Sequence, residues 1–254
     1  MKMNGNTVLI TGGAGGIGFA LAEAFLNAGN EVIICSKRKD RLLKAQAQYP
    51  ALHVRECDVS DGSSRDSLVS WIAENHKNLN ILVNNACIQK DIDFRLGKEE
   101  LLKGESEIRT NLEAPIYLCA SLVPLLMNQQ AAAIVNVSSA LGIIPMAQMP
   151  VYCATKAGLH IFTKCLRRQL VLTNIRVFEV IPPAVDTEPN MQNRRSRLEA
   201  GWQVAMQTIS ASEYISSVME RLEKDELEIV GSKLKNASLA EQESMFESMN
   251  TAWR

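Results

Sequence analysis

The sequence has few of the residue groupings that mark metalloproteins and disulfide-stapled domains. It holds only three histidines, His53, His76 and His160, and its six cysteines include no CxxC pair. Zinc ligands and stapling disulfides usually occur as closely spaced cysteines and histidines. We therefore expect no metal site, and we expect reduced thiols that pack as small apolar groups in a cytoplasmic protein.

Net charge is nearly absent as well. Twenty-seven Lys and Arg stand against 28 Asp and Glu, which leaves a formal charge of −1. Such a chain has no overall field that would attract nucleic acid or an anionic membrane. No apolar run approaches the roughly 18 to 20 residues of a membrane span, and the N-terminus has no signal-peptide core. We expect a soluble, unexported protein with no nucleic-acid partner and no membrane partner.

What the sequence does contain is a regular alternation of two apolar patterns. Short β-branched runs predict strands, and stretches with helical spacing, such as Ile17, Leu21 and Phe25, follow them. Most of these strands are apolar throughout, so both faces should be covered. The pattern predicts an α/β fold with a doubly wound parallel seven-stranded sheet and helices on both faces. The predicted strands are Thr7–Ile10, Glu31–Cys35, His53–Cys57, Ile81–Val83, Ala133–Val137, Ile175–Ile181 and Leu227–Val230.

No repeat, low-complexity tract or linker divides the chain, so we expect a single domain over residues 1–254. Its dinucleotide-binding half would cover about residues 1–130, and its catalytic and substrate-binding half about 131–254. A polar, Arg-rich stretch follows Pro182-Pro183. The segment 186–205 is predicted to be a loop, either a lid or a solvated surface loop without function.

A glycine-rich turn, TGGAGGIG from Thr11 to Gly18, joins the first predicted strand to the first predicted helix. Backbone N–H groups in such a turn, together with the helix N-terminus, favour a bound pyrophosphate. The spacing has two interpretations: GxGxxG through Gly13, Gly15 and Gly18, or GxxxGxG through Gly12, Gly16 and Gly18.

The end of the second predicted strand indicates which dinucleotide is preferred. An acidic residue here would bind the ribose 2′-OH of NAD, but the strand ends in Ser36, Lys37 and Arg38. A hydroxyl and two cations suit a 2′-phosphate, which favours NADP(H) over NAD(H). The alternative is that Lys37 and Arg38 simply begin a solvated helix.

A pair of hydroxyls, a phenol and an amine lie at the predicted ends of elements in the second half. Ser138 and Ser139 close the fifth strand, and Tyr152 and Lys156 lie four residues apart on the next helix. Residues with this spacing share a helix face, where an ammonium group should lower the pKa of a phenol. This pairing predicts a general acid near neutral pH.

Taken together, these motifs resemble the short-chain dehydrogenase/reductase family over essentially the whole chain. Within the family the sequence is most similar to the DltE-like oxidoreductases, with the segments NNACIQK from Asn84, PVYCATK from Pro150 and PPAVDT from Pro182. The motifs that carry the family resemblance are TGGAGGIG, Cys57-Asp58-Val59, Asn84-Asn85-Ala86, Asn111, Ser139 and Tyr152-xxx-Lys156.

The resemblance implies roles for four residues. Tyr152 would be the acid in carbonyl reduction and the base in alcohol oxidation, and Lys156 would lower its pKa and hold the nicotinamide ribose. Ser139 would bind the substrate carbonyl oxygen. Asn111 would hold a water that relays protons from Lys156, or would serve only as a polar residue that kinks its helix.

The resemblance also implies a Rossmann fold that binds NADP(H), with NAD(H) possible. Two departures from the family pattern are Cys87, where the family has glycine, and Pro183 in the loop after the sixth strand. Besides Ser36, Lys37, Arg38, Tyr152 and Lys156, the positions implied to contact the cofactor are Gly12, Gly15, Gly16, Ile17, Gly18, Asp58, Val59, Asn84, Ala86, Pro182, Val185 and Thr187.

The predicted function is therefore NADP(H)-dependent interconversion of a small-molecule carbonyl and an alcohol. The alternative is a dinucleotide-binding sensor or scaffold protein on the same fold without turnover. A homodimer or homotetramer is implied, packed through the helices that carry Asn111 and Tyr152. Four leucines of the first of these helices could supply the interface or could face the sheet: Leu118, Leu122, Leu125 and Leu126.

Overall fold

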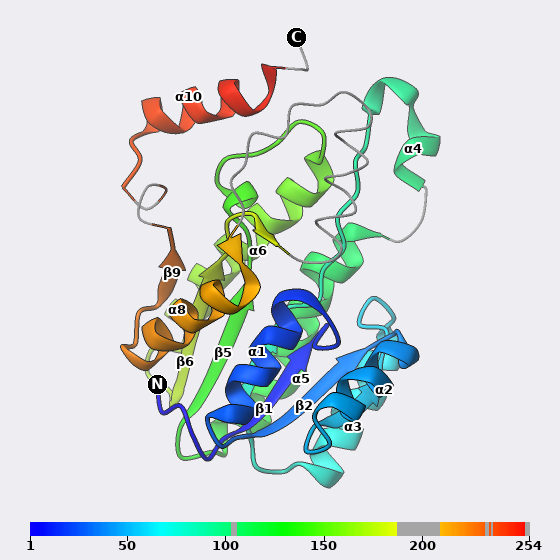
Figure 1. Cartoon of the computed structure of the whole chain (residues 1–254), viewed down its shortest axis with the longest axis vertical. Coiled ribbons are helices and arrows are strands. Elements are labelled where there is room, and N and C mark those ends of the chain that lie inside the picture. Colours follow the sequence, from blue (N-terminus) through cyan, green and yellow to red (C-terminus); the bar gives the residue numbers. More distant parts are fainter. Residues whose placement is uncertain (103–105, 187–208, 232–233, 235, 252–254) are drawn as a thin grey trace.

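A parallel sheet forms the centre of the computed structural model of this chain, which describes residues 1–102, 106–186, 209–231, 234 and 236–251. Its strands run in the order β3-β2-β1-β4-β5-β6-β9, and every neighbouring pair is parallel (Figure 1). The strand order reverses between β1 and β4, where ligand crevices of such sheets open. The predicted fold class is confirmed. The strands are β1 (Thr7–Thr11), β2 (Glu31–Ser36), β3 (His53–Glu56), β4 (Leu79–Asn84), β5 (Ala132–Val137), β6 (Ile175–Ile181) and β9 (Glu228–Val230).

Helices cover both faces of the sheet because successive residues of each strand point to opposite sides. Val8 and Ile10 of β1 pack with α1, α2 and α8, whereas Leu9 packs with α3, α5 and the end of α6. These helices are α1 (Gly16–Asn27), α2 (Lys39–Gln48), α3 (Gly62–Asn75), α5 (Ala114–Met127), α6 (Pro150–Gln169) and α8 (Ala211–Glu223).

Shorter elements lie around the upper end of the molecule in Figure 1. The helix α10 buries none of its own residues, but Asn250 at its end donates to Pro145 O and ties it to the loop before α6. The remaining elements are η1 (Phe94–Leu96), α4 (Lys98–Leu102), η2 (Arg109–Glu113), η3 (Ala140–Gly142), β7 (Val185–Asp186), β8 (Ile209–Ser210) and α10 (Leu239–Met249).

One helical stretch corrects the expectation that no apolar run is long enough to span a membrane. Among the described residues, Arg109–Met127 meets that test by length and composition. Leu118, Leu122 and Leu126 of this stretch are buried in the core against the sheet, and Leu125 packs beside them. The stretch is apolar because it is a core helix, and these leucines face the sheet rather than a partner subunit.

Candidate functional site

The expected site residues gather at the carboxyl edge of the sheet. The glycine turn follows β1, Asn84 ends β4, Ser139 follows β5 and Pro182 follows β6. Because all these strands are parallel, their carboxyl ends meet at one edge. Segments that are far apart in the sequence therefore surround a single region.

Three reactive side chains come together between η3 and α6. Ser139 caps η3, where its Oγ accepts a hydrogen bond from Leu141 N at 3.1 Å, and its hydroxyl lies close enough to the Tyr152 phenol to oppose the rise in the pKa of that group. Lys156 Nζ lies 5.8 Å from the centre of the Tyr152 ring. The same Nζ donates to Val137 O at 2.8 Å. Tyr152 and Lys156 are both buried, so their polar ends meet in a region of low dielectric.

The electrostatics of this pair correct one expectation from the sequence. Burial raises the pKa of the Tyr152 phenol above its ordinary value, and only the Ser139 hydrogen bond opposes it among the leading causes. Burial likewise lowers the pKa of the Lys156 ammonium. The expected lowering of the phenol pKa by Lys156 is wrong for the protein alone, because loss of hydration disfavours both charged forms.

Asn111 lies inside η2, a π-helical turn that interrupts the helix continuing into α5. Its Oδ1 accepts from Ile88 N at 2.8 Å, and its Nδ2 donates to Ile88 O at 2.8 Å and to Thr155 Oγ1 at 3.2 Å. The side chain thus ties the segment after β4 to α6. Such π-helical turns are frequent at functional sites.

Glu107 is a residue of this region that the sequence reasoning missed. It is 1% exposed, and its Oε1 accepts from Lys90 N at 3.0 Å while its Oε2 has no hydrogen-bond partner. Burial raises the pKa of this carboxyl group, whose charge in turn raises the pKa of Tyr152. Glu107 precedes Asn111 by four residues, and this helical spacing was the sequence feature that could have indicated that the two side chains lie on the same side. Together the two side chains hold alternate residues, Ile88 and Lys90, of one extended segment.

The conformation of the glycine turn decides between the two spacings. Gly12 and Gly16 have positive φ values of 64° and 56°. A Cβ on Gly18 would lie 2.3 Å from Asn85 Nδ2 and 2.5 Å from Gly12 O. Gly13 is also required, because a Cβ there would lie 2.5 Å from Ile34 Cγ2, but a Cβ on Gly15 would make only ordinary contacts. All three glycines of the GxxxGxG interpretation are therefore required, whereas the GxGxxG interpretation includes one that is not.

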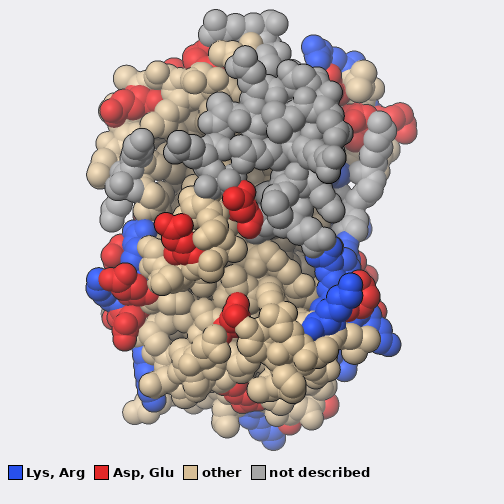
Figure 2. All heavy atoms as spheres, viewed as in Figure 1, with Lys and Arg blue, Asp and Glu red and all other residues tan. Residues whose placement is uncertain are grey.

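Two arginines lie beside Gly15 of this turn. A Cβ on Gly15 would lie 3.4 Å from Arg41 Nη1 and 3.9 Å from Arg38 Nη2. Lys37 and Arg38 are exposed, and Figure 2 shows Lys and Arg gathered over α2 and the loop before it. Arg41 was missed in the sequence because it lies one turn inside α2. A cavity of about 290 Å³ opens here, lined by Ala14, Gly15, Phe19, Asp40, Arg41, Lys44, Ala45 and Gln48.

Ser36, Asp58 and Val59 lie at the ends of β2 and β3, beside this cationic region. Ser36 Oγ accepts from Arg38 N at 3.2 Å. Asp58 Oδ1 accepts from the backbone N and the hydroxyl of Ser60 at 2.9 and 2.7 Å, and Val59 is buried. The positions expected to contact adenine therefore form a tight turn before α3.

Asn84 and Ala86 lie on the opposite side of the glycine turn. Ala86 N donates to Thr11 Oγ1 at 3.0 Å. Asn84 Nδ2 donates to Asn136 Oδ1 at 2.9 Å, and Asn136 in turn donates to Thr163. Because the Asn84 side chain is 2% exposed and bound within the core, a cofactor contact from it would have to come from its backbone.

The loop after β6 is described only in part. Pro182 O accepts from Ala140 N at 2.9 Å, and the buried Val185 pairs with Ile209 in the β7–β8 sheet. Thr187 and the segment 187–205 lie outside the described residues. Cys87, which replaces the usual glycine, is exposed and close enough to Tyr152 and Lys156 to raise the pKa of both.

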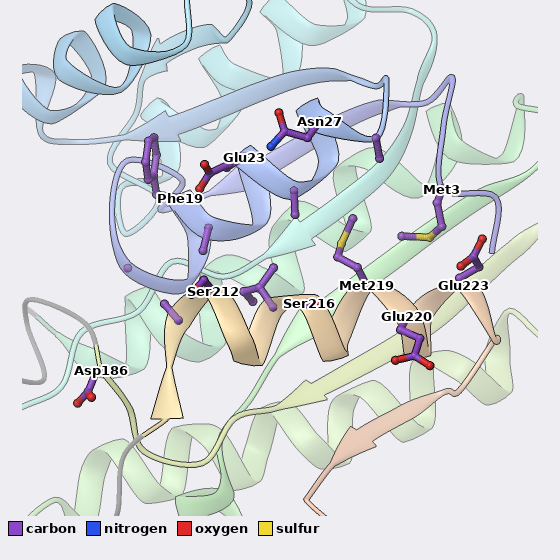
Figure 3. A pocket seen from close by; sticks show the side chains of 16 residues that line it. Met3, Phe19, Glu23, Asn27, Asp186, Ser212, Ser216, Met219, Glu220 and Glu223 are labelled. Atoms are coloured by element: carbon purple, nitrogen blue, oxygen red, sulfur yellow. The ribbon is translucent and has the colours of Figure 1, made fainter.

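A cavity of about 870 Å³ lies away from Ser139, Tyr152 and Lys156. It is a groove between α1 and α8 that begins at Gly16 and reaches Met3 and Glu223 (Figure 3). Ser139, Tyr152 and Lys156 do not line it. Only the start of α1 is common to the groove and the candidate site.

Known proteins are similar to this chain over most or all of its length. Residues 6–199 match the family described as short chain dehydrogenase. The chain is 46% identical to the oxidoreductase DltE of Bacillus subtilis (strain 168) over 99% of each sequence. It is 31% identical to a 3-oxoacyl-[acyl-carrier-protein] reductase, FabG, of Chlamydia pneumoniae, covering 72% of this chain and 75% of that one.

Solved structures show the same fold. A short-chain dehydrogenase from Burkholderia cenocepacia J2315 in complex with NADP aligns with a TM-score of 0.77 at 23% identity, covering 98% of each chain. A short-chain dehydrogenase from Sphingobium yanoikuyae in complex with NADPH aligns with a TM-score of 0.75 at 25% identity, covering 98% of this chain and 94% of that one.

Proposed function

This chain belongs to the short-chain dehydrogenase family, and from that premise we propose that it is an NADP(H)-dependent oxidoreductase that interconverts a carbonyl and an alcohol. One observation carries the proposal. Ser139, Tyr152 and Lys156 converge at the sheet edge that also carries the glycine turn. A hydroxyl, a phenol and an ammonium group beside a phosphate-binding turn suit proton transfer coupled to a dinucleotide reaction.

The glycine turn fits a dinucleotide. Gly15 precedes α1 and has no side chain that could cap the first-turn N–H groups, so these donors are left for an anion. Gly12 approaches Ala86 so closely that a Cβ would lie 2.8 Å from Ala86 Cα. Gly12, Gly15, Gly16, Ile17 and Gly18 would hold the pyrophosphate.

The preference for NADP(H) is supported by the cations beside Gly15. Arg38 and Arg41 place guanidinium nitrogens next to this glycine, and Lys37 lies at the preceding turn. Guanidinium groups bind phosphate through paired hydrogen bonds. No acidic residue stands among Ser36, Lys37 and Arg38, where a 2′-OH would need one. Relatives of the fold bind either dinucleotide, since solved complexes contain NADP or NAD.

A bound nicotinamide supplies the hydride, and the residues of this chain supply orientation and the proton. Ser139 would donate to the substrate oxygen as negative charge develops there. Tyr152 would give its proton to the same oxygen in reduction and accept it in oxidation. In the protein alone the Tyr152 phenol carries the proton that the acid role requires, and burial raises its pKa further. The Lys156 ammonium, held by Val137 O, would stabilise the phenolate left after transfer.

The first test is a titration of the purified full chain with NADPH and NADH, followed by turnover assays on a panel of carbonyl substrates. We expect tighter binding of NADPH and measurable oxidation of it with at least one substrate. Tighter binding of NADH would overturn the assignment of Ser36, Lys37 and Arg38. Binding without turnover on the whole panel would favour the dinucleotide-binding sensor or scaffold protein.

Three further proposals follow from family membership. The substrate is a small molecule, the protein works in the cytoplasm, and the subunits assemble as a homodimer or homotetramer through α5 and α6. Tyr117 and Met127 of α5 and Ile161 of α6 are apolar and more than half exposed, which supports an interface there. Light scattering on the purified protein measures the number of subunits.

A further inference from the structure

The amino edge of the sheet, opposite the candidate site, brings together two of the three histidines and an acidic residue. Glu31 begins β2, His53 begins β3 and His76 ends α3. His76 Nδ1 lies 2.8 Å and His53 Nε2 lies 3.6 Å from Glu31 Oε1. The expectation of scattered histidines is wrong for this pair, because neighbouring parallel strands begin at the same edge.

We propose that Glu31, His53 and His76 form a binding site for a divalent transition-metal ion of the zinc class. Two imidazoles and one carboxylate are the ligand types that such ions prefer. Metal–ligand bonds of about 2.0 to 2.2 Å in a tetrahedral site place ligand atoms roughly 3.4 Å apart. The separations of 2.8 and 3.6 Å lie on either side of that value, and all three ligand atoms lie within 4.8 Å of one another.

Neighbouring residues orient the three proposed ligands. Thr7 Oγ1 donates to Glu31 Oε2 at 2.8 Å, which holds the carboxylate and leaves Oε1 directed at the histidines. The Trp71 ring packs 4.6 Å from the His76 ring, and the His53 ring meets His76 edge-on at 5.0 Å. Such second-layer contacts fix the direction of metal ligands.

The exposure of the three side chains suits an ion that enters from solvent. The His76 side chain is 7% exposed, whereas those of His53 and Glu31 are 49% and 39% exposed. One ligand is therefore anchored in the protein and two are accessible. Water can complete the coordination on the open side.

A proton shared between His76 and Glu31 is the competing explanation for their contact. The third histidine, His160, forms a pair with a carboxylate that has no second histidine beside it among the described residues. His160 Nδ1 lies 2.9 Å from Glu179 Oε2, whose side chain is fully buried, and the described residues place no third ligand with them. The amino edge differs because His53 adds a second imidazole to the same oxygen.

A metal at this site would join β2, β3 and α3 at the edge remote from Tyr152. Binding to the folded state alone stabilises the protein by mass action. We therefore expect the ion to raise the unfolding temperature and to leave turnover unchanged. This expectation does not depend on the proposed oxidoreductase activity.

The test is calorimetric titration of the untagged full chain with ZnCl₂ after removal of metals by a chelator. We expect one equivalent of Zn²⁺ to bind, and we expect at least tenfold weaker binding in His53→Gln and in Glu31→Gln. Both residues are partly exposed, so these variants should fold, and circular dichroism checks this. His160→Gln is the matched control that removes a histidine outside the three ligands and should bind Zn²⁺ as the wild type does.

Two results would overturn the proposal. One is no uptake of Zn²⁺ by the wild type, and the other is unchanged affinity in both variants. The six cysteines are an alternative source of metal ligands. Titration with CoCl₂ separates the two sources, because thiolate coordination produces intense charge-transfer absorption and coordination by histidine and carboxylate does not.

Discussion

Both edges of the main sheet contain buried polar side chains, but the two edges satisfy them differently. At the amino edge, Asn30 Oδ1 accepts from both nitrogens of Asn6, at 3.0 and 2.8 Å. Asn30 Nδ2 donates to Met3 O and Phe25 O at 2.8 and 2.7 Å, and Asn80 bonds both Asn6 and Thr7. Every one of these groups stabilises the start of a strand.

At the carboxyl edge, buried polar atoms remain without partners. Four such side-chain atoms occur among the described residues. Those of Glu107 and Thr110 lie beside the candidate site, whereas that of Asn84 is enclosed in the core. Each unsatisfied group costs roughly 1 to 3 kcal/mol of stability. The polar groups of the amino edge therefore stabilise the fold. Those of the carboxyl edge that lack hydrogen-bond partners lower the stability of the protein alone, and a bound ligand can offset that loss.

The largest expected effect is on the chemistry of the carboxyl edge. Tyr152→Phe removes the phenolic proton and should lower kcat on the order of 10³-fold while the Kd for NADPH stays the same. Turnover and binding assays measure the two quantities. Tyr214→Phe is the matched control, because the Tyr214 hydroxyl is buried and unpaired, and it should keep full turnover. Full activity of Tyr152→Phe would refute the proposed mechanism.

A substitution at the amino edge should lower stability and leave turnover unchanged. Asn30→Ala removes four hydrogen bonds and should lower the free energy of unfolding by about 2 to 3 kcal/mol. Turnover per folded molecule should not change, because the catalytic cluster is at the other edge. Urea unfolding and activity assays on one preparation measure both. A fall in kcat with unchanged stability would contradict the inference that the amino edge stabilises the fold and does not take part in the reaction.

A smaller effect is expected where the carboxyl edge meets α2. Arg41→Ala removes a guanidinium beside Gly15 and should weaken NADPH binding about tenfold, with little change for NADH. Lys224→Ala removes a cation at the end of α8 and serves as the control. Equal loss of affinity for both dinucleotides would show that Arg41 does not contact a 2′-phosphate.

The smallest effect tests the cost of a buried carboxyl group that has one oxygen without a hydrogen-bond partner. Burial raises the pKa of Glu107, so the folded state favours the protonated form. Wild-type stability relative to Glu107→Gln is therefore greatest below the ordinary Glu pKa of 4.5, and it falls as pH rises from there through the raised pKa of the folded state. At pH 8 the Gln variant should be more stable by about 1 kcal/mol, and near pH 4 the gap should close.

Urea unfolding at the two pH values measures the Glu107 effect. Glu56→Gln is the control, since it removes a carboxylate that is exposed at the end of β3. A variant less stable than the wild type at pH 8 would mean that Glu107 is bound as an anion.

Much of the molecule was predictable from local pattern. Continuous apolar runs with helical spacing between them predict a parallel sheet covered on both faces, because a strand buried on both sides must be apolar throughout. The glycines of the turn and the spacing of Tyr152 and Lys156 are also local features. A period of four residues places two side chains on one helix face in any fold.

Other properties depend on residues that only the folded chain brings together. The sequence alone predicts the strands, the glycine turn and the candidate catalytic side chains, because these follow from backbone periodicity and residue chemistry. Tertiary structure decides the raised pKa of Tyr152, the unpaired oxygen of Glu107 and the meeting of His53 and His76 with Glu31. Burial and long-range proximity set these properties, and neither is encoded in the spacing of any one segment.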